Sequence, residues 1–330
     1  MSVDLTFAIC THRRNALLQR ALASLIAAER PPDLTIEVVV VDNSDEGDAA
    51  PVIAAAAERA RCDANPFLIR GLCAHPANIS VARNAALEAS DAPWLAFLDD
   101  DQHIAPDWFV EARRAIRETS ADALFGAIAA QFEAGAQPTS AAQNLFTRKL
   151  NALEGSALYA YGPHKTRGAA LTPGNALFRR ATALAQARFD PAFGLAGGED
   201  FDLFCRLQGA GRRFAWRPAL RAFEFVPATR CEPSYLRRRF YAGGQVYAAA
   251  IAGLSRTPRL ARWRLRGRAL AQALWLAPGA TAASLRGGQA RDEASYVLAG
   301  VLGKLSFGSP HPLYREQANN TIGQSLLTEI

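Results

Sequence analysis

The strongest constraint on the fold is an alternation of strand-like and helix-like segments through the first hundred residues. Short apolar runs predict strands, and between them apolar residues recur at helical spacing. The predicted strands are residues 5–10, 36–41, 66–70 and 94–98, and the predicted helices are residues 16–28, 51–60 and 79–89. This alternation predicts an α/β fold, with a mostly parallel central sheet and helices on both faces.

Three of these strands end in polar residues, which a parallel sheet brings to one edge. Residues 11–13 follow the first strand, residues 42–44 follow the second, and Asp99, Asp100 and Asp101 follow the fourth. Open α/β sheets bind ligands at that edge. Three adjacent like charges favour a compensating cation, and a hard divalent ion takes oxygen ligands. The alternative is a solvated acidic turn, with residues 42–44 capping turns and helices.

A second group of carboxylates lies later in the chain, behind a glycine-rich segment. Residues 194–198 hold three glycines, and Glu199, Asp200 and Asp202 then open a helical run over residues 203–208. Glycines let the backbone approach a ligand, and carboxylates project from the first helical turn. Ordinary helix capping is the interpretation favoured for Asp202, and ligand contact is favoured for the other two. No G-x-G-x-x-G follows the first strand, which argues against a nicotinamide dehydrogenase.

Cysteine usage and charge indicate the compartment and the partners. The five cysteines are scattered and include no C-x-x-C pair, which argues against a disulfide framework and a zinc site. With no basic segment leading into an apolar stretch, we expect a cytoplasmic protein. Residues 206–268 hold fifteen arginines against two glutamates. That positive charge favours a phosphorylated substrate or anionic lipid headgroups, and nucleic acid ranks last because no nucleic-acid motif accompanies it.

Five motifs, in order, resemble those of the inverting family 2 glycosyltransferases, which have the GT-A fold and use nucleotide-activated sugars. They are residues 9–14, 40–44, 78–84, 97–101 (a D-x-D motif) and 197–200 (an E-D motif). The third lacks the glycine of the family's N-x-G-x-x-x-A-R-N pattern. The resemblance covers roughly residues 3–226. It implies a GT-A catalytic domain over residues 1–226 and an arginine-rich helical C-terminal extension over residues 227–330.

The resemblance also implies roles for individual residues. Those implied to hold the donor's nucleotide or diphosphate, or to brace the loops around them, are Thr11, Arg13, Asp42, Arg83, Asn84, Asp99 and Asp100. Asp101, together with Asp99, would bind a divalent metal, Mg²⁺ or Mn²⁺. Many members place a histidine ligand after a later strand. This chain has Glu224 there, so the third ligand is left open.

On the acceptor side, the resemblance implies that Asp200 is the general base and that Glu199 orients the acceptor or its loop. This division agrees with the chemistry, because a sugar hydroxyl has a high pKa and needs a carboxylate to take its proton as it attacks. A divalent ion neutralises the charge that develops on the departing diphosphate. Direct attack by the acceptor inverts the anomeric centre, without a covalent sugar intermediate.

The sequence of the last third of the chain predicts helices, and two alternatives remain for their role. The uncharged stretches 240–255 and 269–285 fall short of a membrane-spanning helix. The helices would lie on a membrane surface, or they would form a lid or dimerisation element. From about Pro310 we expect a poorly ordered tail.

The resulting prediction is a metal-dependent transferase that uses a UDP-, GDP- or dTDP-sugar. Its acceptor would be a saccharide or lipid-linked sugar, in glycolipid or surface-polysaccharide assembly at the cytoplasmic face of a membrane. Two alternatives remain. A nucleotidyltransferase of related fold would carry a glycine-rich, lysine-bearing loop after the first strand, which residues 11–15 lack. A catalytically silent sugar-nucleotide-binding module would not need both Asp101 and Asp200.

Overall fold

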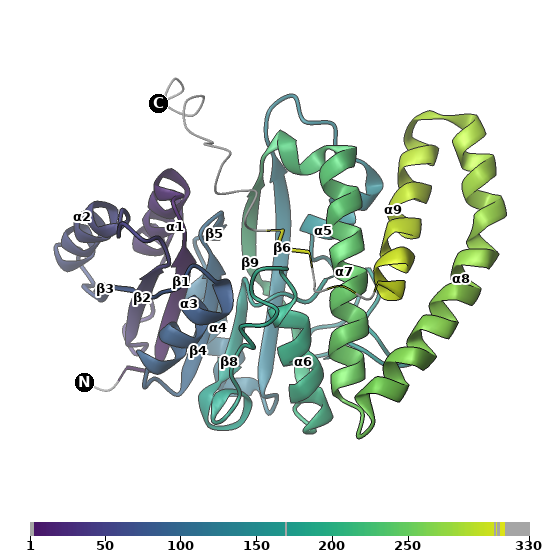
Figure 1. Cartoon of the computed structure of the whole chain (residues 1–330). Helices are drawn as coiled ribbons and strands as arrows, with labels where there is room; N and C mark the ends of the chain where they lie inside the picture. Colours follow the sequence, from purple (N-terminus) through teal and green to yellow (C-terminus); the bar gives the residue numbers. More distant parts are fainter. Residues whose placement is uncertain (1–2, 169, 307, 309–310, 314–330) are drawn as a thin grey trace.

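One mixed sheet with helices on both faces forms the body of the protein, and three further helices extend from it (Figure 1). The computed structural model describes residues 3–168, 170–306, 308 and 311–313. Within them the strands are β1 (Leu5–Thr11), β2 (Ile36–Asp42), β3 (Leu68–Cys73), β4 (Trp94–Asp99), β5 (Gln102–Ile104), β6 (Ala123–Phe132), β7 (Ala157–Leu158), β8 (Ala176–Arg179) and β9 (Phe214–Val226). The α-helices there are α1 (Asn15–Ala27), α2 (Ala50–Arg61), α3 (Ile79–Glu88), α4 (Trp108–Glu118), α5 (Ser140–Phe146), α6 (Glu199–Gly209), α7 (Pro233–Gly253), α8 (Pro258–Arg286) and α9 (Gly288–Leu305). The predicted α/β class, with a C-terminal helical extension, is confirmed.

The first four strands form the parallel half of the sheet, as the alternation predicts. β1 pairs in parallel with β2 and with β4, and β2 pairs in parallel with β3. The third strand lies later than the apolar run suggests, because its pairing with β2 continues to the end of that strand, where Cys73 lies opposite Asp42. The polar ends of β1, β2 and β4 therefore share one edge.

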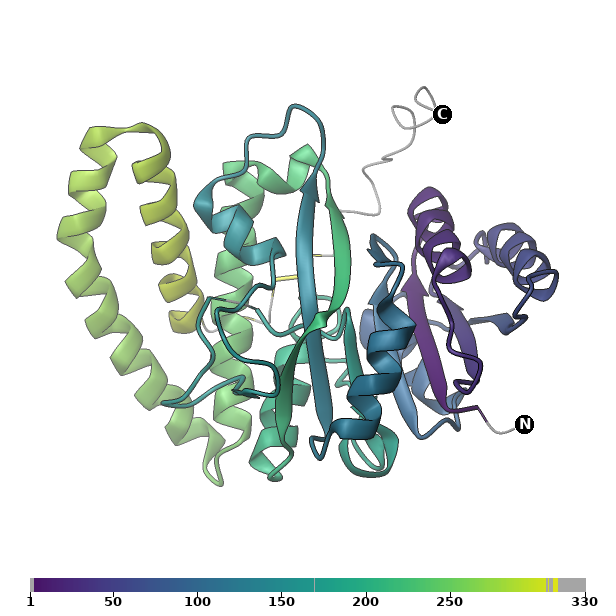
Figure 2. The same cartoon turned by 180° about the vertical axis from the view of Figure 1, so that it is seen from behind.

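Both faces of this half-sheet are buried, which explains the run of valines in β2. Val38 and Val40 join a core with α1, α2 and α4, whereas Val39 and Val41 join a core with α3 and α6. Parallel strands covered on both faces are expected to be apolar without alternation. Figure 1 shows α3 and α6 on the near face, and Figure 2 shows α4 on the opposite face.

The second half of the sheet mixes directions. β8 is antiparallel to both β4 and β6, β9 is parallel to β6, and β5 is antiparallel to β9. Because β8 runs against β4, its entry loop meets the end of β4, and Asn175 N–H donates to the carbonyl of Phe97 at 2.8 Å. Because β5 starts directly after the aspartates and pairs with β9, Gln102 lies opposite Glu224. These two pairings define the surroundings of the aspartates.

The helices α7, α8 and α9 form what we call the C-terminal arm. α7 packs against α6, and α9 lies between α7 and α8 (Figure 1). Two glycines permit the close approach of α7 and α9: a Cβ on Gly244 would lie 2.1 Å from the carbonyl oxygen of Gly300, and one on Gly303 would lie 2.0 Å from that of Tyr241. None of the helices that the structure describes is long and apolar enough to cross a membrane. The tail expected from about Pro310 lies outside the described residues, apart from residues 311–313.

Candidate functional site

The three aspartates at the end of β4, here called the β4 carboxylates, lie among arginines and a threonine. Asp100 is buried and accepts a hydrogen bond from Thr11 Oγ1 at 2.9 Å, at the end of β1. Its Oδ1 pairs with Arg14 Nη1 at 2.5 Å. Burial raises the pKa of Asp100 to about 6, although Arg14 opposes the shift. Asp100 thus ties the end of β4 to the end of β1.

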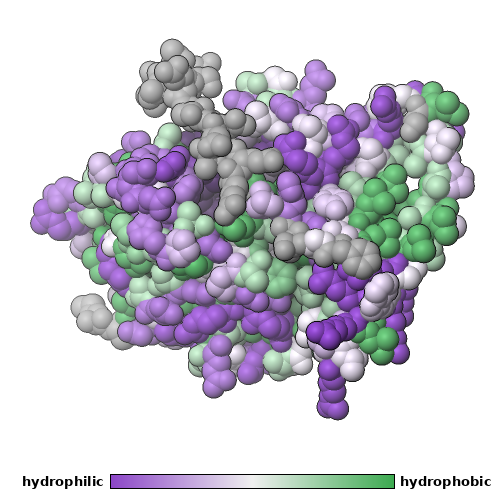
Figure 3. Space-filling view, viewed as in Figure 1, coloured by the Kyte–Doolittle hydropathy of each residue, from purple (hydrophilic) through white to green (hydrophobic). Residues whose placement is uncertain are grey.

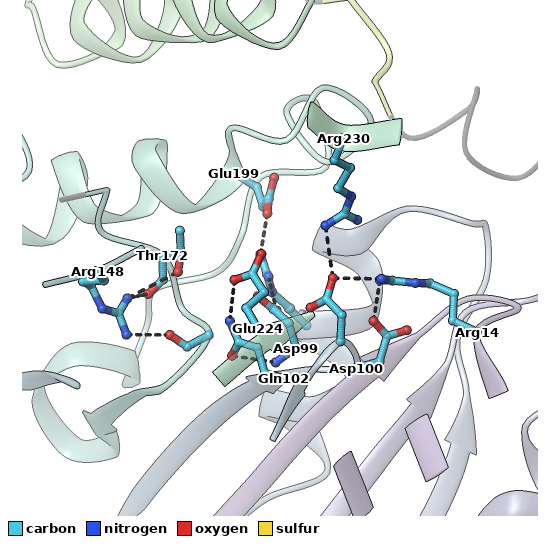
Figure 4. Close-up of polar contacts among 12 residues, drawn as sticks. Arg14, Asp99, Asp100, Gln102, Arg148, Thr172, Glu199, Glu224 and Arg230 are labelled. Atoms are coloured by element: carbon cyan, nitrogen blue, oxygen red, sulfur yellow. Dashed lines mark hydrogen bonds and ion pairs between the residues drawn. The ribbon is translucent and has the colours of Figure 1, made fainter. Parts of the chain in front are cut away.

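Asp101 is held by two guanidinium groups that come from distant parts of the chain. Its Oδ2 lies 2.8 Å from Arg14 Nη2 and 3.1 Å from Arg230 Nη1, and Figure 4 shows both arginines pointing toward the aspartates. Burial alone would raise the pKa of Asp101, but Arg14 and Arg230 outweigh burial and hold it below its ordinary value. Asp101 therefore keeps its negative charge.

Asp99 is the most open of the three, with 35% of its side chain exposed. Its Oδ1 lies 3.1 Å from Arg83 Nη2, on α3. The other end of the same guanidinium, Nη1, pairs with Glu199 Oε1 on α6. A Cβ on Gly174 would stand 2.5 Å from Asp99 Oδ2, so only glycine lets the β8 entry loop lie this close. Arg83 thus bridges the two groups of carboxylates.

Glu199 and Asp200, here called the α6 carboxylates, open α6 after Gly197, whose φ is 72°. Glu199 is 2% exposed, and within the described part of the chain its Oε2 is buried without a hydrogen-bond partner. Burial raises the pKa of Glu199 to about 7; Arg83 opposes that shift and Asp200 adds to it. Burial also raises the pKa of Asp200, against the positive charges of Arg83 and Arg239. A carboxylate with a raised pKa is suited to accept a proton.

Glu224, at the position where the third metal ligand was left open, lies beside the β4 carboxylates. Its Oε2 accepts a hydrogen bond from Gln102 Nε2 at 3.0 Å, as drawn in Figure 4. Burial raises its pKa to about 8, and the charges of Asp101 and Asp99 add to that shift. Three carboxylates therefore repel one another at this edge of the sheet.

The remaining residues of the predicted donor site contact other parts of the protein than the β4 carboxylates. Asp42 is buried, and its two oxygens accept from the backbone N–H groups of Ser44 and Ala49 at 2.9 Å each. Arg13 has a φ of 54°, is 42% exposed and pairs with Glu46 at 2.7 Å.

The side-chain amide of Asn84 bonds both backbone groups of Phe189, donating at 2.8 Å and accepting at 2.9 Å. It therefore holds α3 against the segment that leads to the α6 carboxylates. The two roles implied for Asn84, a place near the donor diphosphate or the bracing of its loop, both stay predictions.

Sequence reasoning missed three arginines. Arg14 lies in the first motif, residues 9–14, but was given no role, and its place in a strand-end loop was the available signal. Arg230 and Arg148 had no such signal, because their partners lie far away in the sequence. Arg148 is 1% exposed and donates to carbonyls of residues 126, 172, 174 and 175, and burial lowers its pKa to about 9. It fixes the loop that lies against Asp99.

The carboxylate oxygens at the end of β4 suit a divalent ion only when a substrate supplies further ligands. No three His, Cys, Asp or Glu side chains in the described part of the chain converge on one point as a ready metal site. Magnesium, however, is commonly held by one or two carboxylates together with substrate phosphates. Asp99, Asp101 and Glu224 provide hard oxygen donors whose mutual repulsion a cation would relieve.

A family model and a curated relative agree on one family, and solved structures share the fold. The model of "Glycosyl transferase family 2" matches residues 6–182. The succinoglycan biosynthesis protein ExoM of Rhizobium meliloti (strain 1021) is 32% identical over 252 residues, which span 76% of each chain. Among solved structures, the mannosyltransferase PcManGT of Pyrobaculum calidifontis, in complex with GDP-Man and Mn²⁺, matches with a TM-score of 0.57 and 17% identity over 92% of this chain and 88% of that one. TarS 1-349 of S. aureus matches with a TM-score of 0.52 and 16% identity over 96% of this chain and 92% of that one.

Proposed function

The chain belongs to glycosyl transferase family 2, and from this premise we propose that it is a metal-dependent inverting enzyme that moves a sugar from a nucleotide-sugar donor to a hydroxyl acceptor. The observation that carries the proposal is the pair of carboxylate groups bridged by Arg83. Two separated acidic sites are what this chemistry needs, one for the leaving diphosphate and one for the attacking hydroxyl.

On the donor side, Asp101 and Asp99 would hold Mg²⁺ or Mn²⁺, with Glu224 within reach as a further oxygen donor. The ion, when bound, neutralises the charge of the departing diphosphate. Mn²⁺ accompanies the donor in the PcManGT structure, which supports a divalent ion here. Arg14 and Arg230 keep Asp101 ionised and in place.

Residues at the ends of β1 and β2 would hold the nucleotide. Thr11 reaches the β4 carboxylates, and Arg13, paired with Glu46, carries an exposed guanidinium at the same edge. Asp42 shapes the loop after β2 through its own backbone hydrogen bonds, so we infer that it places this loop for the base or ribose. Similar structures with UDP, UDP-GlcNAc or GDP-Man support a nucleotide-sugar donor.

On the acceptor side, Asp200 is proposed as the general base that takes the hydroxyl proton during attack. Glu199 has one oxygen fixed by Arg83 and one buried oxygen without a partner in the described structure. A buried carboxylate oxygen left in this state is costly unless a donor reaches it. A sugar hydroxyl is a suitable donor, so we infer that Glu199 orients the bound sugar.

The ExoM relative, named for succinoglycan biosynthesis, supports a role in polysaccharide assembly. The acceptor would be a growing saccharide or its lipid-linked form, with the enzyme working in the cytoplasm, peripheral to the inner face of a membrane. We assign the catalytic unit to residues 1–226 and the extension to residues 227–330, whose first turn brings Arg230 to Asp101.

The direct test is a screen of UDP-, GDP-, dTDP- and CMP-sugars, with and without Mn²⁺, by thermal shift and by nucleotide release. A ligand that binds the native state raises its melting temperature, by an amount that grows with its concentration over Kd. We expect one donor class to stabilise the protein in a Mn²⁺-dependent way and to release its nucleotide when an acceptor is added. Absence of both effects for every donor would refute the proposal.

A further inference from the structure

The exposed apolar side chains of this protein are concentrated on the C-terminal arm. Of the eleven large hydrophobic residues that are exposed within the described part of the chain, six lie on α8 and two on α9. Figure 3 shows hydrophobic residues gathered at this end of the molecule. Monomeric soluble proteins rarely leave such residues clustered unless the cluster meets a partner.

Five of the six on α8 lie on one side of the helix. They are Leu260, Trp263, Leu270, Leu274 and Leu285, exposed by 45% or more, and we call them the α8 stripe. At 3.6 residues per turn their positions fall within about 80° of the helix circumference. Ala269, on the other side of α8, is 2% exposed. The stripe thus points away from the rest of the protein.

The charge around the stripe has a single sign. Between Glu232 and Asp292 the chain holds eleven arginines and no acidic residue. Arg264, Arg268 and Arg286 are exposed on the helix surface next to the stripe, and in the described structure they make no ion pair. Arginines beside leucines and a tryptophan form the pattern of a helix that lies in a membrane interface, where the charged ends reach lipid phosphates.

We propose that α8 docks the protein on an anionic lipid bilayer, with the α8 stripe entering the acyl boundary and the three arginines binding lipid phosphates. A second copy packed on the stripe would bring arginines against arginines in a region without acidic residues. A nucleic acid would engage the arginines but leave the leucines in water. Docking rests on the α8 surface alone, so a failure here would leave the proposed sugar transfer intact.

Vesicle co-sedimentation with the full chain tests the proposal. The probe is vesicles of equal parts phosphatidylglycerol and phosphatidylcholine, compared with phosphatidylcholine alone. We expect strong binding only to the anionic vesicles, weakened by salt. Leu270→Ser with Leu274→Ser should lower the partition coefficient at least about tenfold. Arg264→Gln with Arg268→Gln should lower it about fivefold for each arginine removed.

Matched controls separate docking from general surface effects. Leu153 is 84% exposed but lies in the catalytic domain, so Leu153→Ser should bind vesicles like the wild type. Arg59→Gln on α2 is the corresponding arginine control. Unchanged binding in both double variants would overturn the proposal. It would also be overturned if the wild type were a dimer that bound no vesicles and that Leu274→Ser converted to monomers, or if a DNA duplex bound tightly and no vesicle did.

Discussion

The β4 carboxylates and the α6 carboxylates lie on either side of Arg83, but they differ in how many positive charges face them and in their pKa values. Asp101 meets two guanidinium groups, which hold its pKa below the ordinary value. Glu199 shares Arg83 with Asp99, keeps one buried oxygen without a partner in the described structure, and has a pKa raised to about 7. One group is built around a fixed negative charge and the other around a carboxyl that can gain or lose a proton near neutral pH. This difference matches the proposed division between donor and acceptor chemistry.

The largest expected effect comes from the α6 side, with Asp200→Asn. The amide keeps the shape of the side chain but cannot accept the acceptor's proton, so transfer should fall by about 10²- to 10⁴-fold. Donor affinity, measured by thermal shift, should be unchanged, because this residue does not hold the diphosphate. Wild-type turnover in this variant would move the general base to another residue.

The next largest effect should come from the β4 side, with Asp101→Asn. The variant loses a charge that the proposed ion needs, so the Mn²⁺-dependent part of donor binding should disappear and transfer should fall about 10²-fold or more. Titration of Mn²⁺ against donor-induced stabilisation measures this directly. Asp107→Asn is the matched control, because Asp107 is also paired with an arginine, Arg221 at 2.8 Å, but lies on the surface outside the site. An Asp101→Asn enzyme with wild-type Mn²⁺ dependence would remove the metal assignment.

A third expected effect is a dependence of the transfer rate on pH that comes from the α6 carboxylates and not from the β4 carboxylates. The α6 pair faces Arg83 from α3, Arg239 from α7 and Asp99 from β4, and burial still raises the pKa of both its members. Such a pair titrates as a unit. Transfer should therefore fall about tenfold for each pH unit below the raised pKa of Asp200, where the base becomes protonated. The rate profile at saturating donor measures this limb.

The same raised pKa values have an opposite consequence for stability. The folded pair binds protons more tightly than the unfolded chain does, so its contribution to stability is complete below the ordinary carboxyl pKa and declines as the pH rises through about 7. Glu199→Gln removes one of the two α6 carboxylates that face Arg83, which should favour ionised Asp200 and shift the rate profile to lower pH. A profile that stays in place would mean that Glu199 has no influence on the base.

The parallel half of the fold and the places of both carboxylate groups at the ends of elements could be predicted from local sequence, whereas the roles of these groups stay predictions. Apolar runs such as residues 36–41 reveal a strand covered on both faces, and an abrupt change to Asp99 marks where that kind of strand ends. The direction of β8 could not be predicted in the same way. It depends on pairing with β4 and β6, which are distant in the sequence.

The arginine partners could not be predicted for a related reason. Arg230 lies 129 positions from Asp101, and Arg83 lies 116 positions from Glu199, so only the closed fold brings the charges together. The sequence nevertheless contains the reason they are needed, since buried carboxylates must be paired or neutralised. The composition shows that arginines are plentiful, but which of them face the site depends on the fold.

The smallest effect is expected for Asp202→Asn. This variant tests whether any carboxylate in the first turn of α6 supports transfer, or only the α6 carboxylates. Asp202 follows Asp200 by two residues on α6 but pairs with Arg206, four residues on, at 2.7 Å, in the arrangement of an ordinary helix salt bridge. Transfer should be unchanged. Stability should fall by about 0.5 kcal/mol, and the melting temperature by about 1 °C or less, as expected for a pair whose arginine is partly solvated.

The result at Asp202 is informative because the first turn of α6 holds three acidic residues that all favour the positive end of the helix dipole. If capping were their common role, Asp200→Asn and Asp202→Asn would produce similar small losses of stability and no loss of transfer. If the α6 carboxylates form a separate group defined by Arg83 and burial, only Asp200→Asn will stop transfer. Calorimetric melting of both variants beside their turnover numbers therefore separates a helix terminus from a proton-accepting site.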